Sequence, residues 1–208
     1  MMIIYLETNS IMAIAKGRNK ELEDFIYRRL DNLKSENLKF VIPSICLMET
    51  LMALEREEKR SQSFFQTIHI EMNEGKRNQE LTKSQSFVSF LESSLIDYDD
   101  ILTDFRKRLF QILEYLNQHG ELIEPRIKML ENTLSNPLIT GKNSRRDDFI
   151  LQVILDHAKN QNNSSIPQVF FSENTQDFGG ANIQQVLASA GISYFSKISN
   201  LLGWLNQQ

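Results

Sequence analysis

Short apolar runs alternate along the chain with longer segments whose apolar residues recur every three or four positions. The first run, Ile3 to Leu6, is followed at once by Glu7 and small polar residues, and three similar runs come later. A short apolar run between turn signals is consistent with a strand buried on both faces. The pattern therefore predicts strands at 3–6, 39–42, 168–172 and 192–195.

Segments with a helical period separate these runs. They predict helices at 11–15, 20–34, 44–54, 147–159, 183–190 and 198–205, and Ser44 is expected to cap the third of them. Between residues 61 and 135 the helical spacing continues, with breaks near Gly75 and Gly120. We expect two or three long helices and almost no strand in that stretch.

Strands that alternate with helices predict a parallel sheet covered on both faces. A chain of 208 residues is long enough for one substantial core and a helical excursion. We therefore expect one α/β domain over residues 1–208, in which residues 56–135 form a mainly helical insert.

Composition narrows the class of protein. Apolar residues make up 41% of the chain and charged residues 24%, as in a globular protein, and the net charge of -4 excludes a generally basic nucleic-acid binder but not a local basic patch. The single cysteine, Cys46, allows no disulfide within the chain. The first residues lack a signal-peptide pattern, and no run is long enough to span a membrane, so we expect a cytoplasmic protein.

Acidic residues lie at similar places along the predicted sheet. Glu7 ends the first strand, Glu49 lies one turn into the helix after the second, Asp147 and Asp148 open the helix before the third, and Asp177 follows the third. The carboxyl ends of parallel strands share one edge, where ligands bind. Carboxylates gathered there repel one another, and Mg²⁺ or Mn²⁺ would relieve that repulsion and could activate water for phosphodiester hydrolysis.

Each acid also has a purely structural interpretation. Asp147 or Asp148 could cap a helix, Asp177 could cap the turn at Gly179, and Glu7 could be an exposed strand-end acid. Glu49 is harder to explain in this way, because its helix face is apolar and expected to be buried. The order of all four stretches favours a shared site.

These stretches resemble the PIN-domain family. Leu6-Glu7-Thr8-Asn9 stands where the family usually has Asp-Thr-Asn, and Pro43-Ser44 leads to Glu49. Asp148-Phe149-Ile150-Leu151 resembles the family's helix-opening Asp, and Ser172 to Phe178 resembles its strand-end segment. The resemblance covers roughly residues 1–55 and 140–208, and it implies a PIN-like three-layer α/β/α sandwich with a central, mainly parallel sheet of four to five strands.

The resemblance also implies a metal-dependent ribonuclease that uses Mg²⁺ or Mn²⁺, either a toxin of a toxin–antitoxin pair or an RNA-processing enzyme. RNA is the implied partner, and an antitoxin, another protein or a second copy remain open. The implied metal ligands are Glu7, Glu49 and Asp148, with Asp177 direct or through water. Asp148 is favoured because Phe149-Ile150 follows it, and Asp147 is its alternative or a cap. Thr8 and Asn9 would orient Glu7, Ser172 and Asn174 would bind metal-bound water or substrate, and Lys142, Arg145 and Arg146 would bind phosphates.

Two other functions compete with this hypothesis. A catalytically degenerate PIN-like module would serve as a binding or scaffold protein, with the helical insert making the contacts. A phosphoryl-transfer enzyme of another doubly wound fold would need an Asp nucleophile directly after the first strand, where this chain has Glu7. No Gly-rich phosphate loop is present, which argues against a nucleoside triphosphate as cofactor.

Overall fold

A five-stranded parallel sheet forms the centre of the fold. The computed structural model describes residues 1–31, 38–78, 80–141, 144–161 and 166–207. The strand order is β3-β2-β1-β4-β5, and every neighbouring pair is parallel. The strands are β1 (Met2–Leu6), β2 (Leu38–Pro43), β3 (Glu121–Ile123), β4 (Gln168–Phe171) and β5 (Ile192–Phe195). Their carboxyl ends therefore all lie along one edge of the sheet.

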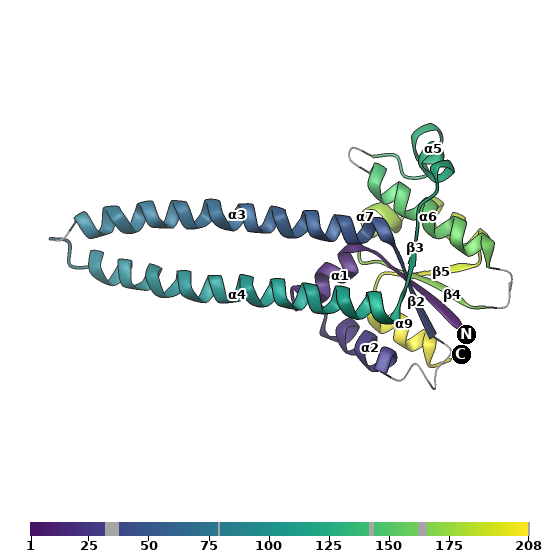
Figure 1. Ribbon diagram of the computed structural model, residues 1–208, viewed down its shortest axis with the longest axis horizontal. Helices are drawn as coiled ribbons and strands as arrows, with labels where there is room; N and C mark the ends of the chain where they lie inside the picture. Colours follow the sequence, from purple (N-terminus) through teal and green to yellow (C-terminus); the bar gives the residue numbers. More distant parts are fainter. Residues whose placement is uncertain (32–37, 79, 142–143, 162–165, 208) are drawn as a thin grey trace. The chain divides into compact units, whose positions relative to one another are not determined.

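Helices cover both faces of this sheet. Helices α5 (Ile127–Ser135) and α6 (Arg145–Asn160) lie on one side, and α1 (Thr8–Ala15), α2 (Lys20–Asp31) and α9 (Ile198–Leu205) lie on the other (Figure 1). Two short helices, α7 (Thr175–Phe178) and α8 (Ala181–Ser189), connect β4 to β5. The central strands β1 and β4 are almost fully buried, as a sheet covered on both faces requires. The prediction of a three-layer α/β/α sandwich is confirmed.

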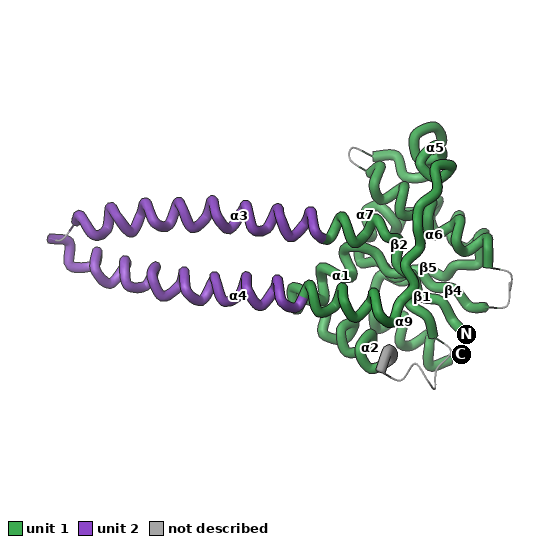
Figure 2. Tube along the Cα trace, viewed as in Figure 1, with its two compact units in different colours: residues 1–50, 109–208 green, residues 51–108 purple. Residues whose placement is uncertain are grey.

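The remaining helices are long and cross a boundary between two compact units. Helices α3 (Ser44–Arg77) and α4 (Ser84–His119) each contribute to both units (Figure 2). Unit 1 comprises residues 1–50 and 109–208 and contains the sheet, and unit 2 comprises residues 51–108. We call unit 2 the helical hairpin.

The hairpin is an antiparallel pair of helices with a regular seam. Its inward positions alternate spacings of three and four, as in a coiled coil. At one end, the Ser84 hydroxyl donates to the Gly75 carbonyl over 2.6 Å, and a Cβ on Gly75 would lie 2.6 Å from Val88. Gly75 thus permits a close approach of the two helices. The seam residues are Leu54, Glu58, Ser61, Phe65, Ile68, Met72 and Gly75 in α3, and Ser84, Val88, Leu91, Leu95, Tyr98, Leu102 and Phe105 in α4.

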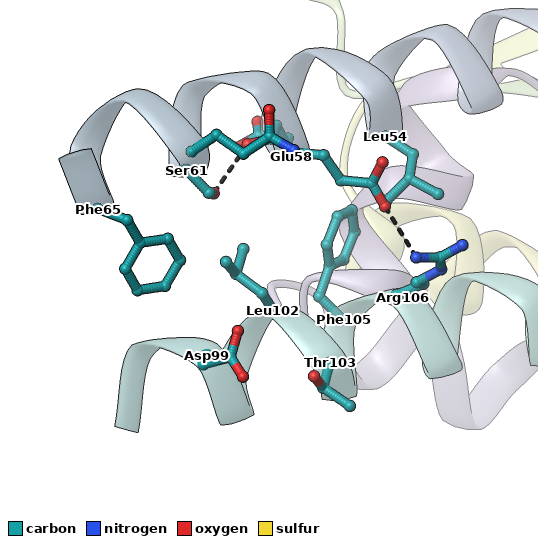
Figure 3. Close-up of a pocket in the computed structure, with 11 residues that line it drawn as sticks. Leu54, Glu58, Ser61, Phe65, Asp99, Leu102, Thr103, Phe105 and Arg106 are labelled. Atoms are coloured by element: carbon teal, nitrogen blue, oxygen red, sulfur yellow. Dashed lines mark hydrogen bonds and ion pairs between the residues drawn. The ribbon is translucent and has the colours of Figure 1, made fainter. Parts of the chain in front are cut away.

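Polar residues interrupt the seam at one end of the hairpin. A cavity of about 300 Å³ lies there between the two helices, lined in part by Ser61, Phe65 and Leu102 (Figure 3). Glu58 occupies a seam position and pairs with Arg106 over 3.3 Å. A charged seam residue packs less tightly than an apolar one, which accounts for the gap.

One prediction about elements needs correction. The helix expected at 44–54 continues to Arg77, since the charged residues after Leu54 face outward while the seam spacing persists. The stretch expected to contain almost no strand has, among its described residues, only the three-residue β3, which pairs with β2. Among the described residues, no helix combines the length and apolar character needed to cross a bilayer.

Candidate functional site

Glu7 lies at the carboxyl end of β1 and caps helix α1. Its Oε2 accepts the backbone N–H of Asn9 at 2.6 Å, and its Oε1 accepts the Ser172 hydroxyl at 3.0 Å. The side chain is only 1% exposed. Ser172 follows β4, the neighbour of β1, and its own backbone carbonyl accepts the Tyr194 hydroxyl at 2.9 Å. Glu7 is thus held between two adjacent strand ends.

Glu49 approaches the same edge from helix α3. Its Oε2 accepts the Thr8 hydroxyl at 2.6 Å, and its Oε1 lies 3.5 Å from the guanidinium of Arg146. Glu49 is 9% exposed, so the burial expected from its apolar helix face is observed. Thr8 directly follows Glu7, and it therefore brings the ends of β1 and α3 together.

Asp147 and Asp177 are joined by one amide. The Asn174 side chain donates to Asp177 Oδ2 at 2.8 Å and lies 3.4 Å from Asp147 Oδ1. Asn174 also caps α7, because its Oδ1 accepts the backbone N–H of Asp177 at 3.3 Å. One asparagine therefore positions carboxylates from the loop after β4 and from the first turn of α6.

Asp148 makes different contacts from Asp147. Its Oδ1 accepts the backbone N–H groups of Leu138 and Ile139 at 2.6 and 2.9 Å. Its Oδ2 is buried and has no hydrogen-bond partner within the described ranges. The structure thus ties Asp148 to the loop before α6, whereas Asp147 meets the residues that follow β4.

Electrostatic coupling joins Glu7, Glu49, Asp147 and Asp177, which we call the acidic edge. Burial raises the pKa of Glu7 to about 7; the Asn9 and Ser172 hydrogen bonds lower it, and the charges of Asp147 and Glu49 raise it. Burial, then Asp177 and Glu49, raise the pKa of Asp147 to about 6, while Arg146 lowers it. Burial and then Glu7 also raise the pKa of Tyr194 to about 12.

Only some of the residues expected to bind phosphate or to orient Glu7 lie at the acidic edge. Arg146 contacts Glu49, but Arg145 donates instead to the carbonyls of Thr133 and Leu134 at 3.1 and 3.3 Å. Lys142, expected in the same cluster, lies outside the described residues. Asn9 reaches Glu7 only through its backbone N–H, and its side chain is exposed.

Two residues near this edge were missed in the sequence. Glu124 directly follows β3, and its carboxylate accepts the Ser44 hydroxyl at 2.7 Å. The apolar pair Leu122-Ile123 after Gly120 was the available signal for that strand. For Tyr194 the sequence indicates only a strand position, although its hydroxyl donates to the backbone carbonyl of Ser172.

The donor set is suited in type to a hard divalent cation. The acidic edge offers only carboxylate oxygens, the ligands that Mg²⁺ and Mn²⁺ prefer. The raised pKa values of Glu7 and Asp147 reflect burial and repulsion, both of which a cation would offset. In the part of the chain that the structure describes, no three His, Cys, Asp or Glu side chains already form a complete metal-binding group. Hydroxyl and amide donors hold the carboxylates instead.

Comparison with known proteins assigns the family. A family model described as PIN domain matches residues 4–178 of this chain. The match includes β1 to α7 and all four carboxylates of the acidic edge. Neither the curated proteins nor the solved structures gave a match. Since the match covers most of the chain and the sheet has the expected parallel architecture, this protein belongs to the PIN-domain family.

Proposed function

We propose that this protein is a metal-dependent endoribonuclease whose acidic edge binds Mg²⁺ or Mn²⁺. The observation that carries the proposal is that hydrogen bonds hold acids from four separate segments at one edge of the sheet. Thr8, next to Glu7, donates to Glu49, and Ser172 donates to Glu7. Asn174 donates to Asp177 and approaches Asp147. PIN domains generally use divalent metals. Asp147 replaces Asp148 in the proposed ligand set, because the contacts of Asp148 go to the backbone of Leu138 and Ile139.

A bound cation would supply Lewis-acid stabilisation of the phosphate and a more acidic water. The residues of the chain have other tasks. Ser172 and Thr8 hold Glu7 and Glu49 through hydrogen bonds, and Asn174 holds Asp177 and approaches Asp147. Fixing ligand orientation in this way raises metal affinity and activity.

Arg146 is the proposed phosphate contact. It is the cationic residue whose guanidinium lies beside Glu49, and its side chain is 49% exposed, so it can reach a substrate. The net charge of -4 makes such a local cation necessary for RNA binding. Arginine suits this task because its planar guanidinium matches phosphate oxygens.

Cleavage of a fluorescent single-stranded RNA with Mg²⁺ or Mn²⁺ tests the proposal. We expect cleavage that EDTA abolishes, and a loss of about 100-fold or more in Glu49→Gln and Asp147→Asn, since loss of one metal-site group typically costs that order. Asp24→Asn is the matched control, because this half-buried acid forms its observed ion pairs with Lys20 and Arg28 of its own helix. Unchanged cleavage in Glu49→Gln would refute the proposal.

A second candidate is a PIN module that binds RNA without cutting it. The observation that favours it is that both oxygens of Glu7 already accept hydrogen bonds within the protein. Calorimetric titration with Mn²⁺ separates the two functions, since the nuclease binds the ion and the degenerate module does not. If the nuclease is a toxin, expression should arrest growth and Glu49→Gln should relieve the arrest.

A further inference from the structure

The two long sides of the helical hairpin differ in chemistry. One side is formed by the residues that come directly after every second seam residue in the sequence. All of them are polar: Glu55, Gln62, His69, Lys76, Gln85, Glu92, Asp99 and Arg106. On the other side, apolar residues interrupt the polar surface. We call Phe64, Ile70, Phe87, Phe90 and Ile101 the apolar face of the hairpin; all five are exposed, Phe90 by 68% and Ile101 by 63%.

Contacts between α3 and α4 show which residues of the two helices lie at the same level, and so locate the centre of this face. Tyr98 of α4 contacts three residues of α3: its hydroxyl lies 3.3 Å from that of Ser61, and its ring centroid lies 5.1 Å from that of Phe64 and 5.6 Å from that of Phe65. In an antiparallel pair, Thr67 is therefore level with residues 92–96 of α4, with Ser94 at the middle of that span. Thr67 and Ser94 are small and polar and mark the centre of the face.

Residue types on either side of this centre complement one another in α3. Three residues before Thr67 is Phe64, and three residues after it is Ile70. Seven residues before it is Arg60, and seven residues after it is Glu74. About Thr67, an apolar residue therefore corresponds to an apolar residue, and a cationic residue corresponds to an anionic one.

The same relation holds in α4. Seven residues before Ser94 is Phe87, and seven residues after it is Ile101. Lys83 lies eleven residues before Ser94, and Asp104 lies ten residues after it. Both helices therefore complement themselves about one level of the hairpin, which is the requirement for an isologous twofold interface.

We propose that two copies of this chain associate through the apolar faces of their hairpins and form an antiparallel four-helix bundle. The twofold axis passes at the level of Thr67 and Ser94. Phe64 then packs on the partner's Ile70 and Phe87 on the partner's Ile101, while Arg60 meets the partner's Glu74. This interaction is independent of the proposed nuclease activity.

The size and charge of the face fit a second copy. Two helices, each about 10 Å wide and about six turns long, give roughly 600–700 Å² per copy and about 1,300 Å² in total, within the range of stable interfaces. Acids such as Glu71, Glu74 and Asp97 interleave with the cations, which disfavours RNA or an anionic membrane as the occupant.

Sedimentation velocity of the full chain tests the proposal. We expect a dimer at micromolar concentration, and at least a tenfold weaker dimer in Phe87→Lys/Phe90→Lys. Ile96→Lys is the matched control, because Ile96 is an apolar residue of the same helix, 65% exposed, outside the apolar face. Circular dichroism of each variant verifies that the hairpin stays helical. A monomeric wild-type chain, or a dimer that the double variant leaves intact, would overturn the proposal.

Charge reversal and cross-linking test the antiparallel register. Arg60→Glu and Glu74→Arg should each weaken the dimer, and the two together should restore it to within about threefold. Thr67→Cys should form a disulfide with its own counterpart, as should Ser94→Cys, whereas Gln62→Cys on the polar side should not; native Cys46 is buried. Disulfides that form only in a mixture of the Thr67→Cys and Ser94→Cys chains would show a parallel arrangement and contradict the register.

Discussion

At the residue scale, two adjacent aspartates make different contacts. Successive residues of a helix point about 100° apart, so Asp147 and Asp148 face different neighbours. Asp147 approaches Asn174 at the acidic edge, and Asp148 holds the loop that contains Leu138 and Ile139. We therefore propose a functional role for Asp147 and a structural role for Asp148.

Alanine substitution separates these roles. Asp148→Ala leaves the N–H groups of Leu138 and Ile139 without their acceptor and should destabilise the protein by about 2–4 kcal/mol. At pH 7, Asp147→Ala should not lower the free energy of unfolding of the metal-free protein, because it removes a carboxylate whose pKa is raised by burial and repulsion, but it should abolish Mn²⁺ binding. Denaturant unfolding and calorimetry measure the two effects. Equal loss of stability in both variants would argue against the division.

The raised pKa values of Glu7 and Asp147 predict how stability depends on pH. Their ordinary values are 4.5 and 3.8, and in the folded protein they rise to about 7 and about 6. The folded state thus binds more protons than the unfolded state between pH 4 and 7. The stabilisation is present below about pH 4 and is lost as pH rises through 6 to 7.

Thermal melts of the metal-free protein from pH 4.5 to 8 measure this dependence. From pH 5 to 8, the free energy of unfolding should fall by about 2 kcal/mol less in Glu7→Gln than in the wild type. The reason is that the variant removes Glu7, whose pKa is raised more than that of Asp147. Saturating Mn²⁺ should reduce this fall in the wild-type chain as well. A wild-type profile identical to that of Glu7→Gln would show that Glu7 does not titrate in this range.

At the scale of elements, apolar periodicity predicted most of the sheet and its helices. Strands β1, β2, β4 and β5 each contain a short, mainly apolar run bounded by polar or turn residues, so the sequence signals them. Strand β3 has three residues and α7 has four, too few for either period to be visible. Strand β3 depends on a tertiary contact, its pairing with β2. Helix α7 depends on a local cap, in which Asn174 Oδ1 accepts the backbone N–H of Asp177.

The site was only partly predictable for a similar reason. Position along the chain identified Glu7, Glu49 and Asp177, because each follows a predicted strand closely. The sequence favours Asp148 as the metal ligand, and our proposal of Asp147 instead depends on the path of the preceding loop, which supplies the amides that bind Asp148. A local sequence pattern contains no information about that loop.

The first turn of α6 also contains two adjacent arginines with different contacts, Arg145 and Arg146, which can be compared as Asp147 and Asp148 are. Arg146→Ala should raise the Kd for RNA by about three- to tenfold and lower the salt dependence of binding by about one counterion. Arg145→Ala should leave RNA binding unchanged and lower stability by about 1 kcal/mol, since it donates to the carbonyls of Thr133 and Leu134. Fluorescence anisotropy at several salt concentrations measures both. Equal effects on RNA affinity would contradict the assignment of Arg146.

At the scale of the whole molecule, the hairpin is proposed as an insert in a single PIN-like domain. Removal of residues 62–75 and 84–97 deletes two heptads from each helix and keeps the seam in register. We expect this shortened chain to cleave RNA within about threefold of the wild-type rate and to be monomeric. Loss of cleavage in a folded, shortened chain would show that the hairpin contributes to the site itself.

The most direct test of the central claim is anomalous diffraction from crystals grown with Mn²⁺. The account predicts a peak within about 2–2.5 Å of carboxylate oxygens from at least two of Glu7, Glu49, Asp147 and Asp177. The peak should be absent in crystals of Asp147→Asn grown in the same way. A wild-type crystal with no peak at this edge, or with a peak only at Asp148, would contradict the proposed metal site.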